Sequence, residues 1–70
     1  MDAGMTEISA SDCDALLWNS HMKLMREAKY PDGTMHMYWG RKDAPEPEVL
    51  DVYPPKGEGK HYMLPTPLEV

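Results

Sequence analysis

The chain has 70 residues, and its 12 acidic and seven basic side chains give a formal net charge of −5. A chain this short buries only about 60% of the surface that its unfolded form exposes, so its core alone stabilises it weakly. The single cysteine, Cys13, excludes an internal disulfide and is typical of a reducing compartment. The acidic balance disfavours direct binding to nucleic acid or to an anionic membrane, because both depend on basic side chains.

No stretch approaches the roughly 20 apolar residues that cross a bilayer. The first residues are acidic and do not resemble a secretion signal. We therefore expect a cytoplasmic protein. One small domain is predicted over residues 9–65, after a flexible leader over residues 1–8 and before a tail over residues 66–70.

The strongest helix signal lies near the N-terminus. Two overlapping S-x-x-D patterns begin at Ser9 and Ser11. Both resemble capping boxes, in which the hydroxyl accepts a hydrogen bond from a backbone N–H of the first turn. The turn sequence Tyr30-Pro-Asp-Gly33 is the next stop signal. These signals predict one amphipathic helix over residues 11–29.

The apolar face of this expected helix is wider than a small sheet can cover. At 100° per residue, Cys13 lies on the central apolar arc, and Trp18, Met22 and Met25 extend that arc well beyond it. Tryptophan and methionine are enriched at the centres of protein interfaces. We therefore expect these three side chains to contact a partner protein or a second copy of the chain.

Beyond Gly33 the sequence changes to the alternating pattern of β-strands. We expect three strands, at residues 34–41, 48–53 and 60–64, separated by links rich in proline or glycine. The order predicts an α+β fold in which the N-terminal helix packs on a three-stranded antiparallel sheet.

Alternation also divides the strand residues between two faces. The inward face is expected to carry Met35, Met37, Trp39, Leu50, Val52, Tyr62 and Leu64. The opposite face is expected to carry His36, Tyr38, Asp51, Tyr53 and His61. A shift of one residue would invert any of these assignments.

The sequence contains none of the motifs that accompany common catalytic sites. Cys13 and His21 are eight residues apart on the expected helix, too far for a thiol–imidazole hydrogen bond. We therefore expect no enzymatic activity, no catalytic residue, no metal site and no cofactor. A Cu(I)-binding protein is a third hypothesis, suggested by Met35-His36-Met37, but a strand directs the imidazole away from both thioethers.

A proline-stiffened segment carries the second feature that indicates a partner. Its carboxylates are Asp43, Glu46, Glu48 and Asp51. Carboxylates on an extended segment can match the charge spacing of a nucleic-acid backbone and so occupy a basic protein groove. Together with the apolar anchors, they predict a small acidic module that binds a basic protein surface.

The expected role is that of an inhibitor or modulator. In size, acidity and lack of catalytic motifs the chain is similar to small accessory proteins of phages and mobile elements. We expect it to bind a host enzyme that handles nucleic acid and to block or adjust that enzyme. The alternative is a self-associating structural protein in which the helix edge pairs with its own copy as a homodimer.

Overall fold

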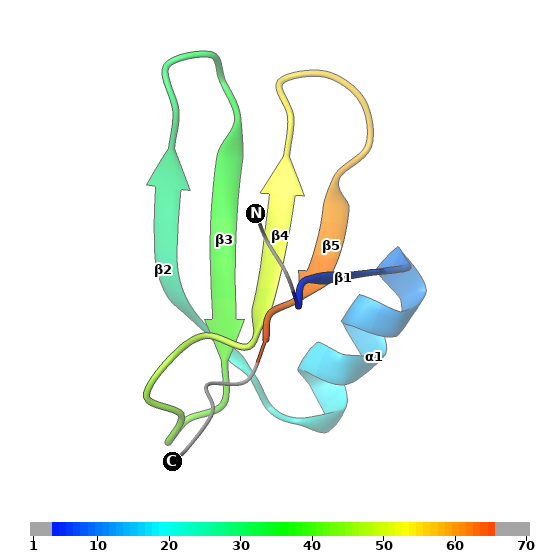
Figure 1. Ribbon diagram of the computed structural model, residues 1–70, viewed down its shortest axis with the longest axis vertical. Helices are drawn as coiled ribbons and strands as arrows, with labels where there is room; N and C mark the ends of the chain where they lie inside the picture. Colours follow the sequence, from blue (N-terminus) through cyan, green and yellow to red (C-terminus); the bar gives the residue numbers. More distant parts are fainter. Residues whose placement is uncertain (1–3, 66–70) are drawn as a thin grey trace.

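One helix packs on one face of a five-stranded antiparallel sheet in the computed structural model, which describes residues 4–65 (Figure 1). The elements are β1 Thr6–Ile8, α1 Ala10–Asn19, β2 Lys23–Lys29, β3 Met35–Gly40, β4 Val49–Tyr53 and β5 Lys60–Met63. The strand order is β1-β5-β4-β3-β2. Strands β2 to β5 therefore form a meander, and α1 connects the two edge strands.

The predicted α+β class is confirmed, whereas the prediction of three strands is wrong. The three expected strands correspond to β3, β4 and β5, and the structure adds an edge strand on each side. Strand β1, Thr6–Ile8, lies within the predicted leader and pairs with β5. The predicted tail, residues 66–70, lies outside the described residues.

The predicted helix over residues 11–29 is wrong in its second half. Helix α1 ends at Asn19, and the chain continues as β2, which pairs with β3. The turn at Tyr30 connects these two strands and does not end a helix: the Tyr30 N–H donates to the Thr34 carbonyl at 2.9 Å. Gly33 supplies the left-handed backbone conformation in this turn, with φ of +100°.

The true end of α1 is a Schellman motif without glycine. The Met22 N–H donates to the Leu17 carbonyl at 3.0 Å, and the His21 N–H donates to the Trp18 carbonyl at 3.3 Å. His21 takes the left-handed position with φ of +52°. Because glycine usually occupies this position, the sequence lacks the common stop signal at the point where the helix ends.

Strand pairing corrects the predicted faces of β4 and β5. Met37 pairs with Asp51, and Asp51 pairs with His61. Directly opposed residues share a face, so the two polar side chains lie on the same side of the sheet as Met37. Tyr53 pairs with Met35 on this side as well. The expectation that Asp51, Tyr53 and His61 lie opposite the methionines is wrong by one step of alternation.

Helix α1 covers only part of this face. It packs chiefly against β5, and Cys13 contacts Asp51 of β4. The buried residues among those described are few: Cys13, Gly40, Val49, Leu50 and Asp51. Between α1 and β3 the face is left open. No helix within residues 4–65 has the length and apolar character needed to cross a membrane.

Candidate functional site

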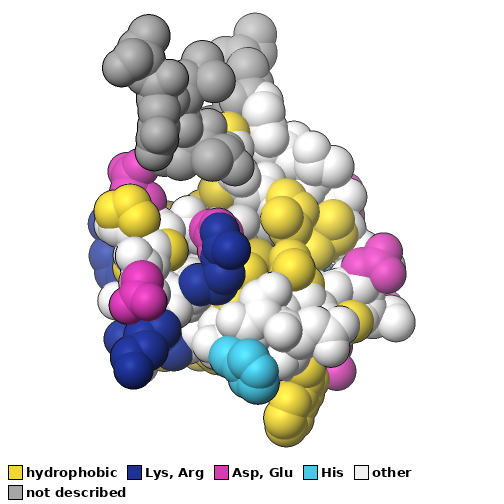
Figure 2. All heavy atoms as spheres, turned by 90° about the horizontal axis from the view of Figure 1, so that it is seen from below, with side chains coloured by type: hydrophobic (Ala, Val, Ile, Leu, Met, Phe, Trp, Pro, Cys, Tyr) yellow, Lys and Arg dark blue, Asp and Glu magenta, His cyan; other side chains and the backbone are white. Residues whose placement is uncertain are grey.

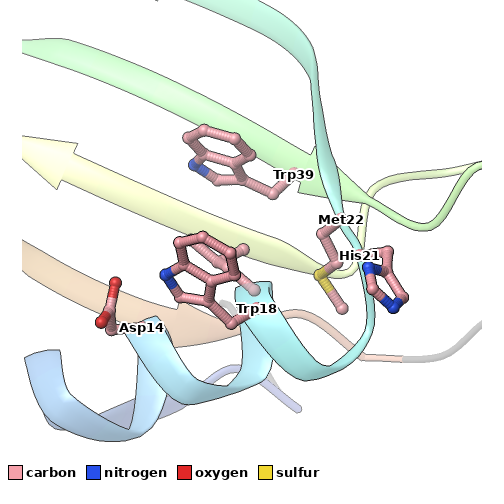
Figure 3. Close-up of a pocket in the computed structure, with 6 residues that line it drawn as sticks. Asp14, Trp18, His21, Met22 and Trp39 are labelled. Carbon is pink, nitrogen blue, oxygen red and sulfur yellow. The ribbon is translucent and has the colours of Figure 1, made fainter.

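An open groove of about 470 Å³ lies between the C-terminal half of α1 and β3 (Figure 3). Its lining residues are Asp14, Leu17, Trp18, His21, Met22 and Trp39. The indoles of Trp18 on α1 and Trp39 on β3 stand on facing walls. The lining is therefore largely apolar, with a carboxylate near one end and an imidazole near the other.

Trp18 is the most exposed large apolar side chain of the described residues, at 75%. Helical geometry explains this position: Cys13 faces the sheet, and Trp18 is rotated by about 140° from it around the helix axis. A tryptophan is rarely left so open to water. Figure 2, which views the molecule from below, shows hydrophobic side chains gathered on this side with charged groups around them. Such a patch is typical of an interaction surface.

The structure brings together two of the three predicted apolar anchors. Trp18, on α1, and Met22, in the link that follows, both line the groove. Met25 lies on β2 and is not among the lining residues. Its Sδ atom packs over Gly40, where an added Cβ would collide with it. The anchors therefore belong to separate elements and not to one helix face.

The predicted acidic segment does not form a continuous acidic surface. Arg41 donates to Glu48 twice, from Nε at 2.8 Å and from Nη2 at 2.6 Å. These hydrogen bonds hold the pKa of the Glu48 carboxyl below its ordinary value. Asp51 is 2% exposed, so this predicted partner-binding residue lies beneath the surface. Asp43 and Glu46 are the two that remain on the surface.

Asp43 lines a second hollow, which adjoins the groove. Residues from the end of α1 and from the turn after β3 form it: Ser20, His21, Arg41, Lys42, Asp43 and Ala44. His21 borders both the groove and this hollow. One predicted acidic residue and two predicted apolar anchors therefore meet at the same end of the molecule.

A buried polar cluster lies beside the groove, where α1 meets the sheet. Asp51 is at its centre. Its Oδ1 accepts a hydrogen bond from Cys13 Sγ at 3.4 Å and lies 2.8 Å from His61 Nδ1. Its Oδ2 accepts hydrogen bonds from Trp39 Nε1 at 3.0 Å and from the Tyr53 hydroxyl at 3.3 Å. Side chains from α1, β3, β4 and β5 thus converge on one carboxylate.

These contacts explain how a carboxylate can be buried in so small a protein. A buried charge is costly unless it is paired and hydrogen-bonded. In residues 4–65, every buried side-chain nitrogen or oxygen has a hydrogen-bond partner. Burial, with the adjacent Asp51 charge, raises the pKa of the Cys13 thiol to about 12. A thiol that keeps its proton is a poor nucleophile, so the cluster is ill suited to catalysis by a cysteine–histidine pair.

Alternation along the chain predicts only part of this cluster. It groups Asp51, Tyr53 and His61 on one face of the sheet, and no spacing along the chain links Cys13 to them. Only the pairing of β4 with β5, and the docking of α1, brings the four together. Cys13, Asp51 and His61 each offer a ligand atom, and these atoms lie within 4.8 Å of one another.

The side chains of Met35, His36 and Met37, on which the copper hypothesis depends, lie on two faces of the sheet. Met35 and Met37 point to the α1 side of the sheet, as predicted from alternation, and His36 pairs with Val52 on the other side. The His36 Nδ1 atom lies 3.5 Å from the Tyr38 hydroxyl there. The three side chains of this motif therefore do not converge on one point.

Comparison of the chain with protein-family models, with curated proteins and with solved structures gives no match. The groove offers apolar contact area at the surface, and the cluster offers buried donor atoms.

Proposed function

We propose that the protein is a small non-enzymatic module that binds another protein through the groove between α1 and β3. The observation that supports this proposal is the 75% exposure of Trp18 at the wall of an apolar groove. A few aromatic side chains supply most of the binding energy in many interfaces. Trp18, together with Trp39 on the opposite wall, is placed to hold one apolar side chain of a partner.

The charges near the groove indicate which charged groups of a partner would lie beside its apolar residue. Asp14 lies in the groove lining. Asp43 lies in the hollow beyond His21, together with Lys42 and with Arg41, whose charge is paired with Glu48. Carboxylates at a rim attract basic groups and increase the association rate more than the affinity. The partner surface that fits is therefore an apolar residue flanked by lysine or arginine.

A strongly positive surface is a common feature of proteins that bind nucleic acid. We propose that the protein occupies such a surface on a host enzyme and inhibits or modulates it, as small accessory proteins of phages do. The net charge of −5 suits this role, because it repels nucleic acid and attracts basic protein surfaces.

A peptide display selection tests the chemistry of the partner. We expect the full chain to enrich peptides in which an apolar residue is flanked by lysine or arginine. Trp18→Ala should weaken binding of these peptides at least about tenfold, because it removes one wall of the groove. Tyr30→Ala is the matched control: Tyr30 is 45% exposed and follows β2, at the end of the sheet away from α1 (Figure 1).

The outcome separates the proposal from nonspecific adhesion. Peptides that bind the wild type and the Trp18→Ala variant equally would contradict it, as would enrichment of acidic peptides. Charge reversal of Asp43 and Glu46 should slow association more at low salt than at high salt, because salt screens exposed charges. An effect independent of salt would remove the electrostatic part of the proposal.

A homodimer is the second candidate, and a second copy has access to both the groove and the open edge of β2. Among residues 4–65, β2 pairs with β3 alone, so its other edge has unpaired backbone groups. Lys23, Arg26 and Lys29 lie on this strand, and such charges oppose edge-to-edge pairing. Light scattering after size exclusion decides between the candidates. A monomer at high concentration removes the dimer, and a dimer that Trp18→Ala dissociates assigns the groove to a second copy.

A further inference from the structure

We propose that Cys13, Asp51 and His61 bind one zinc-class divalent metal ion between α1 and the sheet. The three residues offer a sulfur, a carboxylate oxygen and an imidazole nitrogen, all within 4.8 Å of one another. Zinc takes this type of mixed donor set in proteins. Magnesium and calcium prefer oxygen ligands alone, so the thiol and the imidazole select against them.

Two of the three distances between ligand atoms are close to those of a tetrahedral site. With zinc–ligand bonds of about 2.0–2.3 Å, the ligand atoms of a tetrahedral ion lie roughly 3.3–3.6 Å apart. Cys13 Sγ lies 3.4 Å from Asp51 Oδ1, within that range. His61 Nδ1 lies 2.8 Å from the same oxygen and would need to move by about 0.5 Å. The ligand atoms of Cys13 and His61 lie within 4.8 Å of each other, so both side chains would rotate toward a shared ion, and water takes the fourth position.

The two oxygens of Asp51 have separate environments, as a ligating carboxylate requires. Oδ1 faces Cys13 and His61, the two other proposed ligands. Oδ2 is held by Trp39 Nε1 and by the Tyr53 hydroxyl. Hydrogen bonds of this kind orient metal ligands and are a regular part of metal sites. An ion at Oδ1 would leave both bonds to Oδ2 in place.

The charges also balance. Cys13 and Asp51 are each 2% exposed, so two negative charges at this place would be strongly disfavoured without a cation. A divalent ion with one thiolate, one carboxylate and one neutral imidazole forms a neutral site. The thiol proton passes to the solvent as the sulfur–metal bond forms. The Nδ1 proton of His61 is exchanged through solvent for one on Nε2, so that Nδ1 binds the ion as a neutral imidazole, and no oxidation or reduction takes place.

The position of the site suggests a structural role. The ion would join α1 to β4 and β5, through one ligand from each element. Small domains with little buried apolar surface often use a metal ion for stability. In this chain Cys13, Val49 and Leu50 are the buried hydrophobic residues among those described. The proposal is independent of the groove and does not require that a partner protein binds there.

Titration of the full chain with Co²⁺ tests the site, because a thiolate bound to Co²⁺ gives a charge-transfer absorption band that carboxylate-bound Co²⁺ lacks. After removal of metal by a chelator, we expect this band to saturate at one equivalent, with release of the thiol proton and a raised Tm. Zn²⁺ should then displace Co²⁺ and abolish the band. Absence of the band and of any Tm shift in the wild type would overturn the proposal.

Ligand variants identify the residues. Cys13→Ser should remove the band, and His61→Gln should weaken Zn²⁺ binding by at least about 100-fold, since even outer partners of ligands contribute 10–100-fold. His36→Gln is the matched control, because it removes an imidazole from the opposite face of the sheet. Equal losses with His36→Gln and His61→Gln would overturn the assignment. If a ligand variant does not fold, the band and proton release of the wild type decide the question.

Discussion

His21 has a backbone conformation that is unusual for a residue other than glycine. Its φ of +52° lies in the left-handed region, and it is the only residue other than glycine with positive φ in residues 4–65. Side chains with a Cβ are disfavoured there by roughly 1–2 kcal/mol. The imidazole borders both the groove and the hollow that contains Asp43. The strained position is therefore also the one where the proposed binding surface turns from apolar to polar.

Replacement of His21 by glycine should raise the free energy of unfolding by roughly 1 kcal/mol, because glycine adopts this conformation without steric cost. Asn19→Gly is the control, since Asn19 is the last residue of α1 and glycine weakens a helix. Urea unfolding monitored by circular dichroism measures both. A loss of stability in His21→Gly would show that contacts of the imidazole outweigh the backbone strain.

At the scale of the element, hydrogen bonds at both ends define the bounds of α1. Ser9 is the N-cap: its Oγ accepts a hydrogen bond from the Asp12 N–H at 3.0 Å. Of the two overlapping S-x-x-D patterns, the structure uses the first. Ser11 lies within the first turn of α1 and is exposed. The acidic Asp12 in the same turn is favourable near the positive end of the helix dipole.

The two serines form a natural pair of variants. Ser9→Ala should lower the free energy of unfolding by about 1 kcal/mol, because a backbone N–H of the first turn loses its partner. Ser11→Ala should leave it unchanged or raise it slightly, since alanine favours the helix interior. Chemical denaturation compares them directly. Equal losses in both variants would contradict the assignment of Ser9 as the cap.

On the scale of the whole molecule, a narrow contact attaches α1 to the sheet. Helix α1 connects the edge strands β1 and β2 along the chain, and its Cys13 side chain faces Asp51. Much of its remaining surface is exposed, including Trp18. Detachment of α1 from β4 and β5 would therefore expose the thiol of Cys13 while the meander of β2 to β5 stays paired. The reactivity of this thiol therefore reports the detachment of α1 from the sheet.

Alkylation of Cys13 by iodoacetamide should be at least about 100-fold slower in the folded, chelator-treated protein than in urea. The reason is that the thiol is 2% exposed and keeps its proton, so reaction requires an opening that costs a few kcal/mol. Mass spectrometry follows the rate. Ser9→Ala should accelerate labelling in the folded protein, and Ser11→Ala should not. Similar rates with and without urea would show that α1 does not cover the thiol.

The sequence by itself determined the local features whose causes are local. Alternation located β3, β4 and β5, and the serine pattern located the start of α1. The Pro-Asp-Gly pattern located a turn, although the element before it was expected to be a helix and is the strand β2. Trp18 is exposed, but the wide apolar arc that indicated this was drawn on a helix that ends at Asn19. For the strands, the turn and the start of α1, neighbours within a few residues supply the physical cause, so the pattern can be recognised along the chain.

Only the tertiary structure decided the rest. Residues Lys23–Lys29 have no strong preference against a helix, and they form β2 because β3 offers a partner for their backbone groups. Asp51 is buried because the register places it beside His61 and beneath Cys13, where hydrogen bonds offset the cost of desolvation. Pairing register and helix docking join residues up to 48 positions apart, from Cys13 to His61, and no local pattern contains that information.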